Sequence, residues 1–329
     1  MHSTLYNVNK SLPLERTIYR YTPNSSIPAE YLQLKLPYAG AYFRQDAECD
    51  MLSQHLTLGP YSVWLHDIFS KDNILIRSYT PVPIYTLQFM FEDGLALPKA
   101  GYTLEERECS GFYLFPGQPQ RSPMTADKKV FSFHINILPM QMDVLANKDP
   151  QLRNLMLGIH PRVSSRINSR PYHINGVCDM LIRKIMTCKY EGASAHYFLH
   201  RCVTDIMINF TAQHMDASEP FLYSSMLHTD TCHNIFDYLA EHPHKTHSLA
   251  ALAYMYNINK EEMEDCFHQH FAISITDYMH MIKMMMIFHS LQTASVSLAD
   301  ISQVAGYKTP GELVNDLIAY YGVNPTDLT

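Results

Sequence analysis

The sequence predicts an α+β protein with a β-rich barrel or sandwich over residues 1–140, a helical segment over 141–229 and an all-helical domain over 230–329. Three observations lead to this prediction. In the first segment, short runs of aromatic and β-branched residues are separated by Gly, Pro and Asp-Asn turns. In the second, apolar residues recur at helical spacing. In the third, four polar residues stand where helices would begin.

The four polar residues are each followed three positions later by an acid: Asn259 by Glu262, Ser274 by Asp277, Ser297 by Asp300, and Thr309 by Glu312 with Pro310 between them. A side-chain oxygen at a helix cap accepts hydrogen bonds from the free amides of the first turn. An acid in that turn also suits the positive end of the helix dipole, and proline is favoured at the first helical position. These patterns predict four helix starts.

Two of these starts belong to a repeated pattern of helix, tight turn and helix. The first copy is SLAALAYMYNINKEEM, and the second is SLADISQVAGYKTPGEL. The turns are expected at 257–259 and 305–307, where Gly306 adopts positive φ freely and Asn257 tolerates it. A connecting helix is expected from Ile275 to Leu291. Two helix-turn-helix units on one connecting helix place two recognition helices side by side, which suits successive major grooves of DNA.

This C-terminal stretch resembles the DNA-binding domain of the AraC/XylS family of bacterial transcription regulators. The resemblance starts near Asp230 and implies seven helices, including one over 232–241 that precedes the first unit. The residues that carry it are Leu249, Leu252-Ala253, Met263, Phe267, Tyr278, Ile301, Gly306-Tyr307 and the closing Tyr321-Gly322-Val323-Asn324-Pro325. The family implies a regulator that reads DNA with two helix-turn-helix units under control of an N-terminal sensor domain.

The sequence departs from the family in its basic residues. Arginine is expected in both recognition helices, at positions that here hold Asp265 and Asp316, and Lys283 stands where the connecting helix usually has arginine. The family's Phe-Lys-Lys and terminal Tyr-Arg are replaced by the uncharged stretches 317–319 and 328–329. From Asp230 onward there are four lysines, no arginine and twelve acids, a net charge of −8. Side chains alone therefore cannot neutralise the roughly 6–10 phosphates of a typical strong binder. The remaining sources of positive charge are the helix N-termini and, at mildly acid pH, eight histidines.

The chain of 329 residues is long enough for two domains, or for one domain with an appended module. No apolar run reaches the length of a membrane span, and the N-terminus lacks the apolar core of a signal peptide. Seven scattered cysteines fit a reducing compartment. We therefore expect a cytoplasmic protein with no membrane partner.

Five strands are expected in the N-terminal segment, and the last alternates Phe131, Phe133, Ile135 and Ile137 with polar residues. They cover 61–69, 73–79, 84–92, 111–115 and 130–137. The stretch 114–120 resembles the Pro-Gly turn of the cupin-like sensor domains in AraC-type proteins. Those domains commonly have a histidine where Gln120 stands. We therefore expect a cupin-like barrel without a bound metal.

Two apolar stripes predict helices in the middle segment. One consists of Val177, Leu181, Ile185 and Cys188; the other follows Ser194 and consists of Leu199, Cys202, Val203, Ile206 and Phe210. By family analogy these helices mediate dimerisation or transmit the state of the sensor. Alternatively, they only cover the barrel. The stretch 214–227 contains Asp-Ala-Ser-Glu-Pro and is the expected linker to the last domain.

Other side chains with reactive or metal-binding chemistry favour neither catalysis nor a metal site. The candidates are His242, His244 and His247 with Cys232 and His233, then Cys266, His268 and His270, then His66 with His134, and finally Met284, Met285 and Met286. None has the spacing of a tetrahedral zinc set or of HExxH. The expected alternatives are a solvated turn, surface residues, hydrogen-bonded residues on the sheet and core packing. With no nucleophile elbow or phosphate loop, we expect no enzyme and no cofactor.

The candidate DNA-contacting residues are Asn259, Lys260, Glu261, Glu264 and His268 in the first unit and Lys308, Thr309, Glu312 and Asn315 in the second. Asn, Thr and His side chains hydrogen-bond base edges, and Glu accepts from cytosine N4. Alternatively, Glu261, Glu262, Glu264 and Asp265 form a solvated acidic face. The predicted function is a transcription regulator that binds double-stranded DNA, with a small-molecule effector and a homodimer as expected partners. The alternative is a protein that keeps this fold for sensing or protein–protein contact and binds DNA weakly or not at all.

Overall fold

The computed structural model describes residues 14–16, 27–78, 80–97, 102–118, 120–148, 150–157, 159–160, 162–216, 228–293 and 296–327. The chain forms two compact units, unit 1 from Met1 to Ile174 and unit 2 from Asn175 to Thr329. The predicted segments 1–140, 141–229 and 230–329 divide the chain differently. The helices that begin after Asn175 belong to the same unit as the C-terminal helices. The predicted fold class is confirmed, because unit 1 contains the antiparallel sheets and unit 2 is helical.

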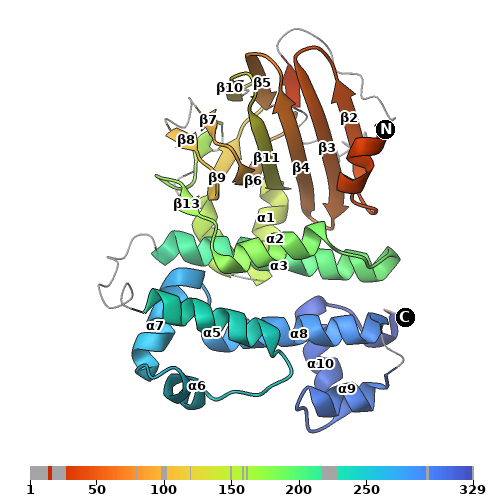
Figure 1. The fold of residues 1–329 in the computed structure, drawn as a ribbon, viewed down its shortest axis with the longest axis vertical. Coiled ribbons are helices and arrows are strands. Elements are labelled where there is room, and N and C mark those ends of the chain that lie inside the picture. Colours follow the sequence, from red (N-terminus) through yellow and green to blue (C-terminus); the bar gives the residue numbers. More distant parts are fainter. Residues whose placement is uncertain are drawn as a thin grey trace. The chain divides into compact units, whose positions relative to one another are not determined.

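Unit 1 consists of thirteen described strands and three short helices (Figure 1). The strands are β1 (Leu14–Arg16), β2 (Gly40–Gln45), β3 (Cys49–Leu58), β4 (Tyr61–Ser70), β5 (Ile74–Ser78), β6 (Ile84–Glu92), β7 (Leu95–Leu97), β8 (Tyr102–Leu104), β9 (Glu108–Leu114), β10 (Gln120–Met124), β11 (Lys129–Ile137), β12 (Ser165–Arg166) and β13 (Tyr172–His173). The helices are η2 (Ala29–Leu34), α1 (Pro139–Lys148) and η3 (Pro150–Met156).

The main sheet is antiparallel and has the strand order β12-β9-β6-β11-β4-β3-β2, with β13 also paired to β9. A three-stranded sheet, β1-β5-β10, and a two-stranded sheet, β7-β8, accompany it. Buried side chains from all three sheets form one apolar cluster that includes Met51, Ile68, Ile76, Leu97 and Met124. The smaller sheets therefore cover part of one face of the main sheet.

The five strands expected from the sequence are present as β4, β5, β6, β9 and β11. The sequence did not predict β2 or β3, although β3 pairs with β4 along its whole length. In β3, polar residues such as Ser53 and His55 are buried, so the strand lacks the alternation of buried apolar and exposed polar residues. Strand β11, which pairs with β4 on its other side, is likewise buried on both faces, including Ser132 and His134.

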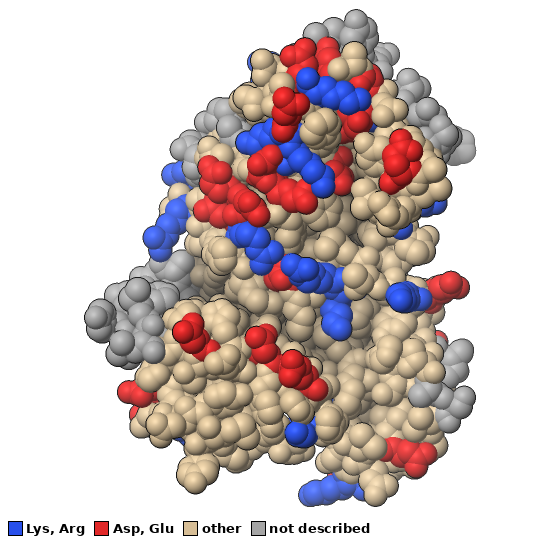
Figure 2. Space-filling model, in the orientation of Figure 1, with Lys and Arg blue, Asp and Glu red and all other residues tan. Residues whose placement is uncertain are grey.

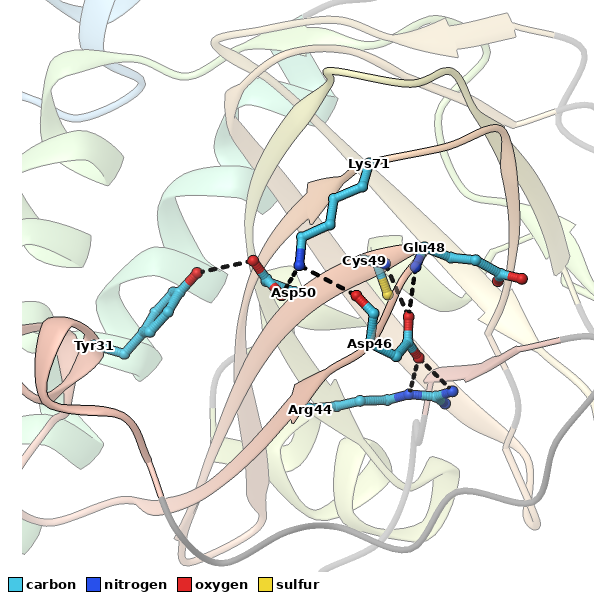
Figure 3. Close-up of polar contacts among 7 residues, drawn as sticks. All are labelled: Tyr31, Arg44, Asp46, Glu48, Cys49, Asp50 and Lys71. Carbon is cyan, nitrogen blue, oxygen red and sulfur yellow. Dashed lines mark hydrogen bonds and ion pairs between the residues drawn. The ribbon is translucent and has the colours of Figure 1, made fainter.

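A cluster of charged side chains ties the turn between β2 and β3 to the start of the β4–β5 connection (Figure 3). The carboxylate of Asp46 accepts hydrogen bonds from the backbone amides of Glu48 and Cys49 over 2.9 and 3.0 Å, and it pairs with Arg44 at 2.7 Å. Lys71 Nζ donates to Asp50 Oδ1 over 2.6 Å and to the carbonyl of Asp46 over 3.1 Å. These contacts fix the end of the β2–β3 hairpin.

Unit 2 consists of α2 (Gly176–Met186), α3 (Gly192–Asp216), α5 (Thr229–Glu241), α6 (Leu249–Met255), α7 (Lys260–Phe271), α8 (Ile275–Thr293), α9 (Leu298–Val304), α10 (Pro310–Tyr321) and η4 (Pro325–Asp327). In Figure 1, α8 runs between the pair α6–α7 and the pair α9–α10. The predicted connecting helix, both helix-turn-helix units and the helix before them are all present. Most of the linker expected over 214–227 lies outside the described residues. Among the described helices, none combines the length and the apolar character needed to cross a membrane.

The predicted caps are confirmed, with one difference in the acids. Ser297 and Thr309 accept hydrogen bonds from the amides of Asp300 and Glu312, and Ser274 accepts from the amide of Asp277. Asn259 accepts instead from the amide two residues on, that of Glu261. The acid expected to complete this first cap, Glu262, lies 3.7 Å from His228 Nε2 on the N-terminal side of α5. The Glu262 carboxylate therefore lies beside the residue that precedes α5.

Candidate nucleic-acid interface

The two helix-turn-helix units have the same local construction. In the first turn Asn257 has φ 50°, and in the second Gly306 has φ 75°. The amide of Ile258 donates to the carbonyl of Ala253 over 3.0 Å, and the amide of Tyr307 donates to that of Ser302 over 2.9 Å. Each recognition helix, α7 or α10, has twelve residues and ends in a left-handed residue, Ala272 or Gly322. The repeat seen in the sequence is thus a repeat of backbone geometry.

The caps define which positions of the two recognition helices correspond. Asn259 and Thr309 are the caps, so Met263 corresponds to Leu313 and Phe267 to Leu317, and all four of these apolar side chains are buried. By the same count, Asp265 corresponds to Asn315, and both are exposed. Asp316 corresponds to Cys266, which is buried. The two aspartates that were expected to be equivalent are therefore one position apart. The second turn has one more residue between its positive-φ residue and its cap than the first.

The predicted DNA-contacting residues lie in α7, α10 and the residues just before them. Seven are exposed: Asn259, Lys260, Glu261, Lys308, Thr309, Glu312 and Asn315. Glu264 and His268 are half-buried. The structure therefore places two sets of accessible polar side chains at the N-terminal parts of the recognition helices. Their contact with DNA stays a prediction.

Several of these side chains already have partners within their own helix. Asn259 Oδ1 accepts from the amide of Glu261 over 2.8 Å, and Lys260 Nζ lies 3.8 Å from Glu264 Oε2. Thr309 Oγ1 accepts from the amide of Glu312 over 3.2 Å, and the Glu312 carboxylate in turn accepts from the amide of Lys308 over 3.0 Å. Backbone amides at both helix starts are thus bonded within the chain, and acids occupy both first turns. A phosphate at either N-terminus would have to displace a carboxylate or lie beside it.

Asp316 is held on the inner side of α10 by residues of the second turn and of α8. The hydroxyl of Tyr307 donates to one carboxylate oxygen, and His280 Nε2 lies 3.0 Å from the other. Lys283 Nζ lies 4.3 Å from the centre of the Tyr307 ring. Burial lowers the pKa of Lys283, while Asp316 opposes that shift. Asp316 and Lys283 therefore brace the second unit against the connecting helix instead of extending toward a ligand.

The C-terminal end of α10 is attached to α3 by a buried ion pair. Tyr320 Oη donates to Asp205 Oδ2 over 2.7 Å, and Arg201 pairs with the other carboxylate oxygen. The Arg201 guanidinium stacks on the Tyr320 ring, with Cζ 3.9 Å from its centre, and donates to the Tyr320 carbonyl over 3.2 Å. Burial raises the pKa of Asp205, and Arg201 counteracts that shift.

The C-terminal end of α7 is attached to the same helix one turn farther along. Asn209 Nδ2 donates to the carbonyls of Phe271 and Ala272 over 2.6 and 3.2 Å. Its Oδ1 accepts from Asn175 Nδ2 over 2.8 Å and from the thiol of Cys178 over 3.2 Å. Asn209 is 2% exposed, so this network is closed to solvent. Since α3 holds the C-terminal ends of both recognition helices, their N-terminal parts are left accessible.

Arg201, Asp205 and Asn209 were not predicted from the sequence. They recur every fourth residue along α3, beside the apolar stripe that predicted this helix. Polar residues at that spacing lie on one face of a helix. Three such residues in a row within an otherwise apolar helix were the signal that could have identified them. Their partners on α7 and α10 could not be read from it, because those contacts join residues 62 to 119 positions apart.

Two other groups of candidate residues are brought together. Cys232 on α5 and Cys266 on α7 are in contact, and His270 also hydrogen-bonds Cys266. The hydrogen bond from Cys232 lowers the pKa of Cys266, while burial opposes that shift. The expectation of a surface position is wrong for Cys266, which is 1% exposed because it shares the core-facing side of α7 with Met263.

In unit 1, His66 and His134 do meet, with ring centres 5.2 Å apart. Each has a hydrogen-bonded partner as expected, and the partner is a serine: Ser53 lies 2.9 Å from His66 Nδ1 and Ser132 3.0 Å from His134 Nε2. Among the described residues, no three His, Cys, Asp or Glu side chains are grouped so as to hold a metal ion.

The C-terminal part of unit 2 has a net negative charge, the same sign as a nucleic acid. In Figure 2, the face over α5, α6 and α9 is mostly uncharged, with separate acidic groups and few basic ones. Of the four lysines after Asp230, Lys283 and Lys245 lie over the rings of Tyr307 and Tyr238, and Lys260 lies beside Glu264. Lys308 is exposed. Any DNA complex of this surface must therefore depend less on phosphate neutralisation than is usual.

No protein-family model and no curated protein matches the chain. Solved structures do match it. The DNA-binding domain of AdpA, solved in complex with a target DNA, has 14% identity, covers 29% of this chain and 86% of its own length, and gives a TM-score of 0.28. The AraC-like transcriptional activator CuxR has 12% identity, covers 85% of this chain and 96% of its own, and gives 0.33. ToxT from Vibrio cholerae has 10% identity, covers 85% and 97%, and gives 0.27. Identity and TM-score are low throughout, so these similarities establish no function for this chain.

Proposed function

We propose that the chain is a transcription regulator whose unit 2 binds double-stranded DNA through its two helix-turn-helix units. The observation that supports this proposal most directly is the repeated geometry of α6–α7 and α9–α10, each with a positive-φ turn, a polar cap and an accessible recognition-helix start. In DNA-binding proteins of this kind, the N-terminal residues of the second helix contact base edges in the major groove.

The connecting helix is of the same order of length as the groove spacing that this role requires, and somewhat shorter. With nineteen residues, α8 spans roughly 28 Å at 1.5 Å per residue. Successive major grooves on one side of B-DNA lie about 34–36 Å apart. Because α3 also fixes the C-terminal ends of α7 and α10, the two recognition helices are held as a pair before any ligand is bound.

Because few basic side chains lie at the recognition-helix starts, DNA binding is expected to depend only weakly on salt. The recognition-helix starts carry two lysines, Lys260 and Lys308, and the first of these is paired with Glu264. With about two phosphate contacts, the logarithm of affinity falls with the logarithm of salt with a slope near −2, where six to ten contacts would give roughly −5 to −9. Asn315, Thr309 and His268 supply hydrogen-bonding groups for base edges, and Glu261 and Glu264 are acceptors for cytosine N4.

The regulatory part of the proposal assigns sensing to unit 1. Its core has buried polar members that include His55, His66 and His134, and the rings of the last two are in contact. We propose that a small-molecule effector or a second copy of the chain acts on this unit and changes the DNA affinity of unit 2. A cytoplasmic location follows from that role. The sequence resemblance to the AraC/XylS family supports this division of labour by analogy.

The proposal is tested by fluorescence anisotropy of the full chain with a labelled pool of random-sequence duplex DNA at low salt, at neutral and mildly acid pH. We expect binding that weakens with salt along the shallow slope given above. Lys308→Ala should weaken it and reduce the slope by about one. Lys35→Ala removes an exposed lysine from unit 1 and should leave both unchanged.

Sequence selection from the same duplex pool separates regulation from nonspecific association. A regulator should enrich one sequence family, and Asn315→Ala should relax the preference within one half of the enriched site. If neither pH gives measurable binding at low salt, the DNA proposal fails. The fold would then serve sensing or protein–protein contact.

A further inference from the structure

Unit 2 contains a pocket of about 920 Å³ between the α2–α3 connection and the connecting helix α8. Its walls come from the end of α2 and the start of α3, the end of α5 and one side of α8. All of its lining residues belong to unit 2. The volume is within the roughly 300–1,000 Å³ that small-molecule sites occupy.

The walls of the pocket are mainly apolar and contain flexible side chains. Met180 lies on α2, Phe198 on α3, and Ile282, Met285 and Met286 on α8. Methionine side chains adapt to irregular apolar ligands because they are unbranched and polarisable. Met180 and Met286 are half-buried, so part of this apolar surface is open to solvent.

One edge of the pocket is positively charged, although the unit as a whole is acidic. Lys184 and Lys189 line it and are exposed, and among the described residues neither forms an ion pair. Glu191 is the single carboxylate in the lining, which leaves the two lysines in excess. Such cations attract an anion without first having to break a salt bridge.

The remaining polar groups give the pocket a fixed shape. Tyr190 Oη and His289 Nδ1 are 3.1 Å apart, which joins the α2–α3 connection to α8. The Tyr190 ring also contacts Phe198 and Phe288, with ring centres 5.0 and 5.3 Å away. The pocket is therefore formed by packed side chains and does not require a ligand to open it.

We propose that this pocket binds a small apolar organic anion, with the apolar part against Met180, Met285 and Met286 and the anionic group at Lys184 and Lys189. An apolar neutral molecule would gain only the first set of contacts, and a small hydrophilic anion only the second. The site is distinct from the recognition helices and from unit 1, and binding there does not depend on DNA binding.

Two fluorescent probes with one aromatic skeleton test the chemical class: anionic 1-anilinonaphthalene-8-sulfonate and neutral N-phenyl-1-naphthylamine. Each lysine is expected to contribute roughly a factor of five to binding of the anion, the Coulomb attraction of one pair at about 4 Å in water. The double variant Lys184→Gln/Lys189→Gln should therefore bind the sulfonate about 25-fold more weakly and the neutral probe within about twofold. Lys35→Gln is the matched control and should change neither. Because both lysines are exposed, the variants are expected to fold, as circular dichroism would verify.

The position of the probe is read from the methyl resonances of the methionines, assigned by single Met→Leu variants. Those of Met180, Met285 and Met286 should shift on addition of the sulfonate, while those of the exposed Met140 and Met255 should not. The proposal is overturned if the methyl groups in the pocket do not respond. It also fails if the neutral probe binds as tightly as the anion, or if the lysine variants bind the anion normally.

Discussion

Tyr320 on α10 and Asp205 on α3 are joined by a hydrogen bond of 2.7 Å, although they lie 115 residues apart in the sequence. Asp205 is 4% exposed, and its other oxygen pairs with Arg201. A buried carboxylate needs such partners, because burial without them costs several kcal/mol. Asp205 thus holds α10 in place, and α10 in turn supplies one of the partners that Asp205 needs in order to be buried as a carboxylate.

Tyr320→Phe should destabilise unit 2 by about 1–3 kcal/mol, because it removes the phenol donor from a charged, buried acceptor. Urea denaturation followed by circular dichroism measures this change. Tyr254→Phe removes a hydroxyl from a side chain that is 91% exposed and should be neutral. Equal midpoints for the two variants would show that the hydrogen bond to Asp205 contributes little.

Two glycine substitutions in the second helix-turn-helix unit should have opposite effects. Gly306 has φ 75°, and an added Cβ would lie 3.3 Å from Thr246 Oγ1, so Gly306→Ala should destabilise by about 1–2 kcal/mol. Gly311 lies within α10 with room for a Cβ, so Gly311→Ala should stabilise by about 0.5–1 kcal/mol. Thermal denaturation of both variants tests the assigned turn, and a stabilised Gly306→Ala protein would contradict it.

Unit 1 should lose stability as the pH falls from about 6.5 toward about 4. Burial lowers the pKa of His55 and of His134 from 6.5 to about 4, and it lowers the pKa of His66 further below its usual value. The folded state keeps these rings neutral, while the unfolded chain takes up protons below pH 6.5. Stability is therefore complete above that pH, and each ring subtracts up to about 1.4 kcal/mol per pH unit below it.

The measurement is the urea midpoint as a function of pH, with His134→Gln as the test variant. It removes one titrating ring and should reduce the slope by about a third. His196→Gln, on the exposed part of α3 in unit 2, is the control and should leave the slope of unit 1 unchanged. A slope that His134→Gln does not alter would mean that His134 is already charged in the fold.

Exchanging charges between the two recognition helices tests whether both face DNA. Asp265 and Asn315 are equivalent exposed positions. Asp265→Asn should strengthen binding to the duplex pool about threefold, and Asn315→Asp should weaken it about threefold, since one charge about 6 Å from a phosphate in water amounts to about 0.7 kcal/mol. Glu30→Gln in unit 1 should have no effect. Equal affinities for all three variants would exclude DNA from both surfaces.

The helices of residues 230–329 could be predicted because their signals are local. A cap such as Ser297 acts within its own turn, and Gly306 has its positive φ for reasons of backbone sterics alone. The central strands β4, β6 and β11 were also predicted, because aromatic and β-branched residues dominate them. Strand β3 was missed because its polar residues are buried by neighbouring strands.

The sequence predicted where the candidate interface lies in the chain, but it did not predict which of its side chains contact one another. That Asn259 and Thr309 precede recognition helices follows from the sequence, and the structure places them there. The sequence did not show that the Asp316 carboxylate hydrogen-bonds Tyr307 and His280, nor that the Lys283 ammonium lies over the ring of the same tyrosine. Such roles depend on how α8 packs against α10, and a pattern along one helix does not contain that information.

The attachment of α7 and α10 to α3 has a consequence for how the protein can be divided experimentally. A truncated fragment starting at Asp230 would expose the apolar surfaces of Phe271, Phe288 and Tyr320 that α2 and α3 now cover, and it would leave the Ala272 carbonyl without its donor, Asn209. Such a fragment should aggregate when expressed alone. The compact unit that keeps these surfaces covered begins at Asn175, so about half as many residues again as the segment 230–329 are needed for it to fold as a whole.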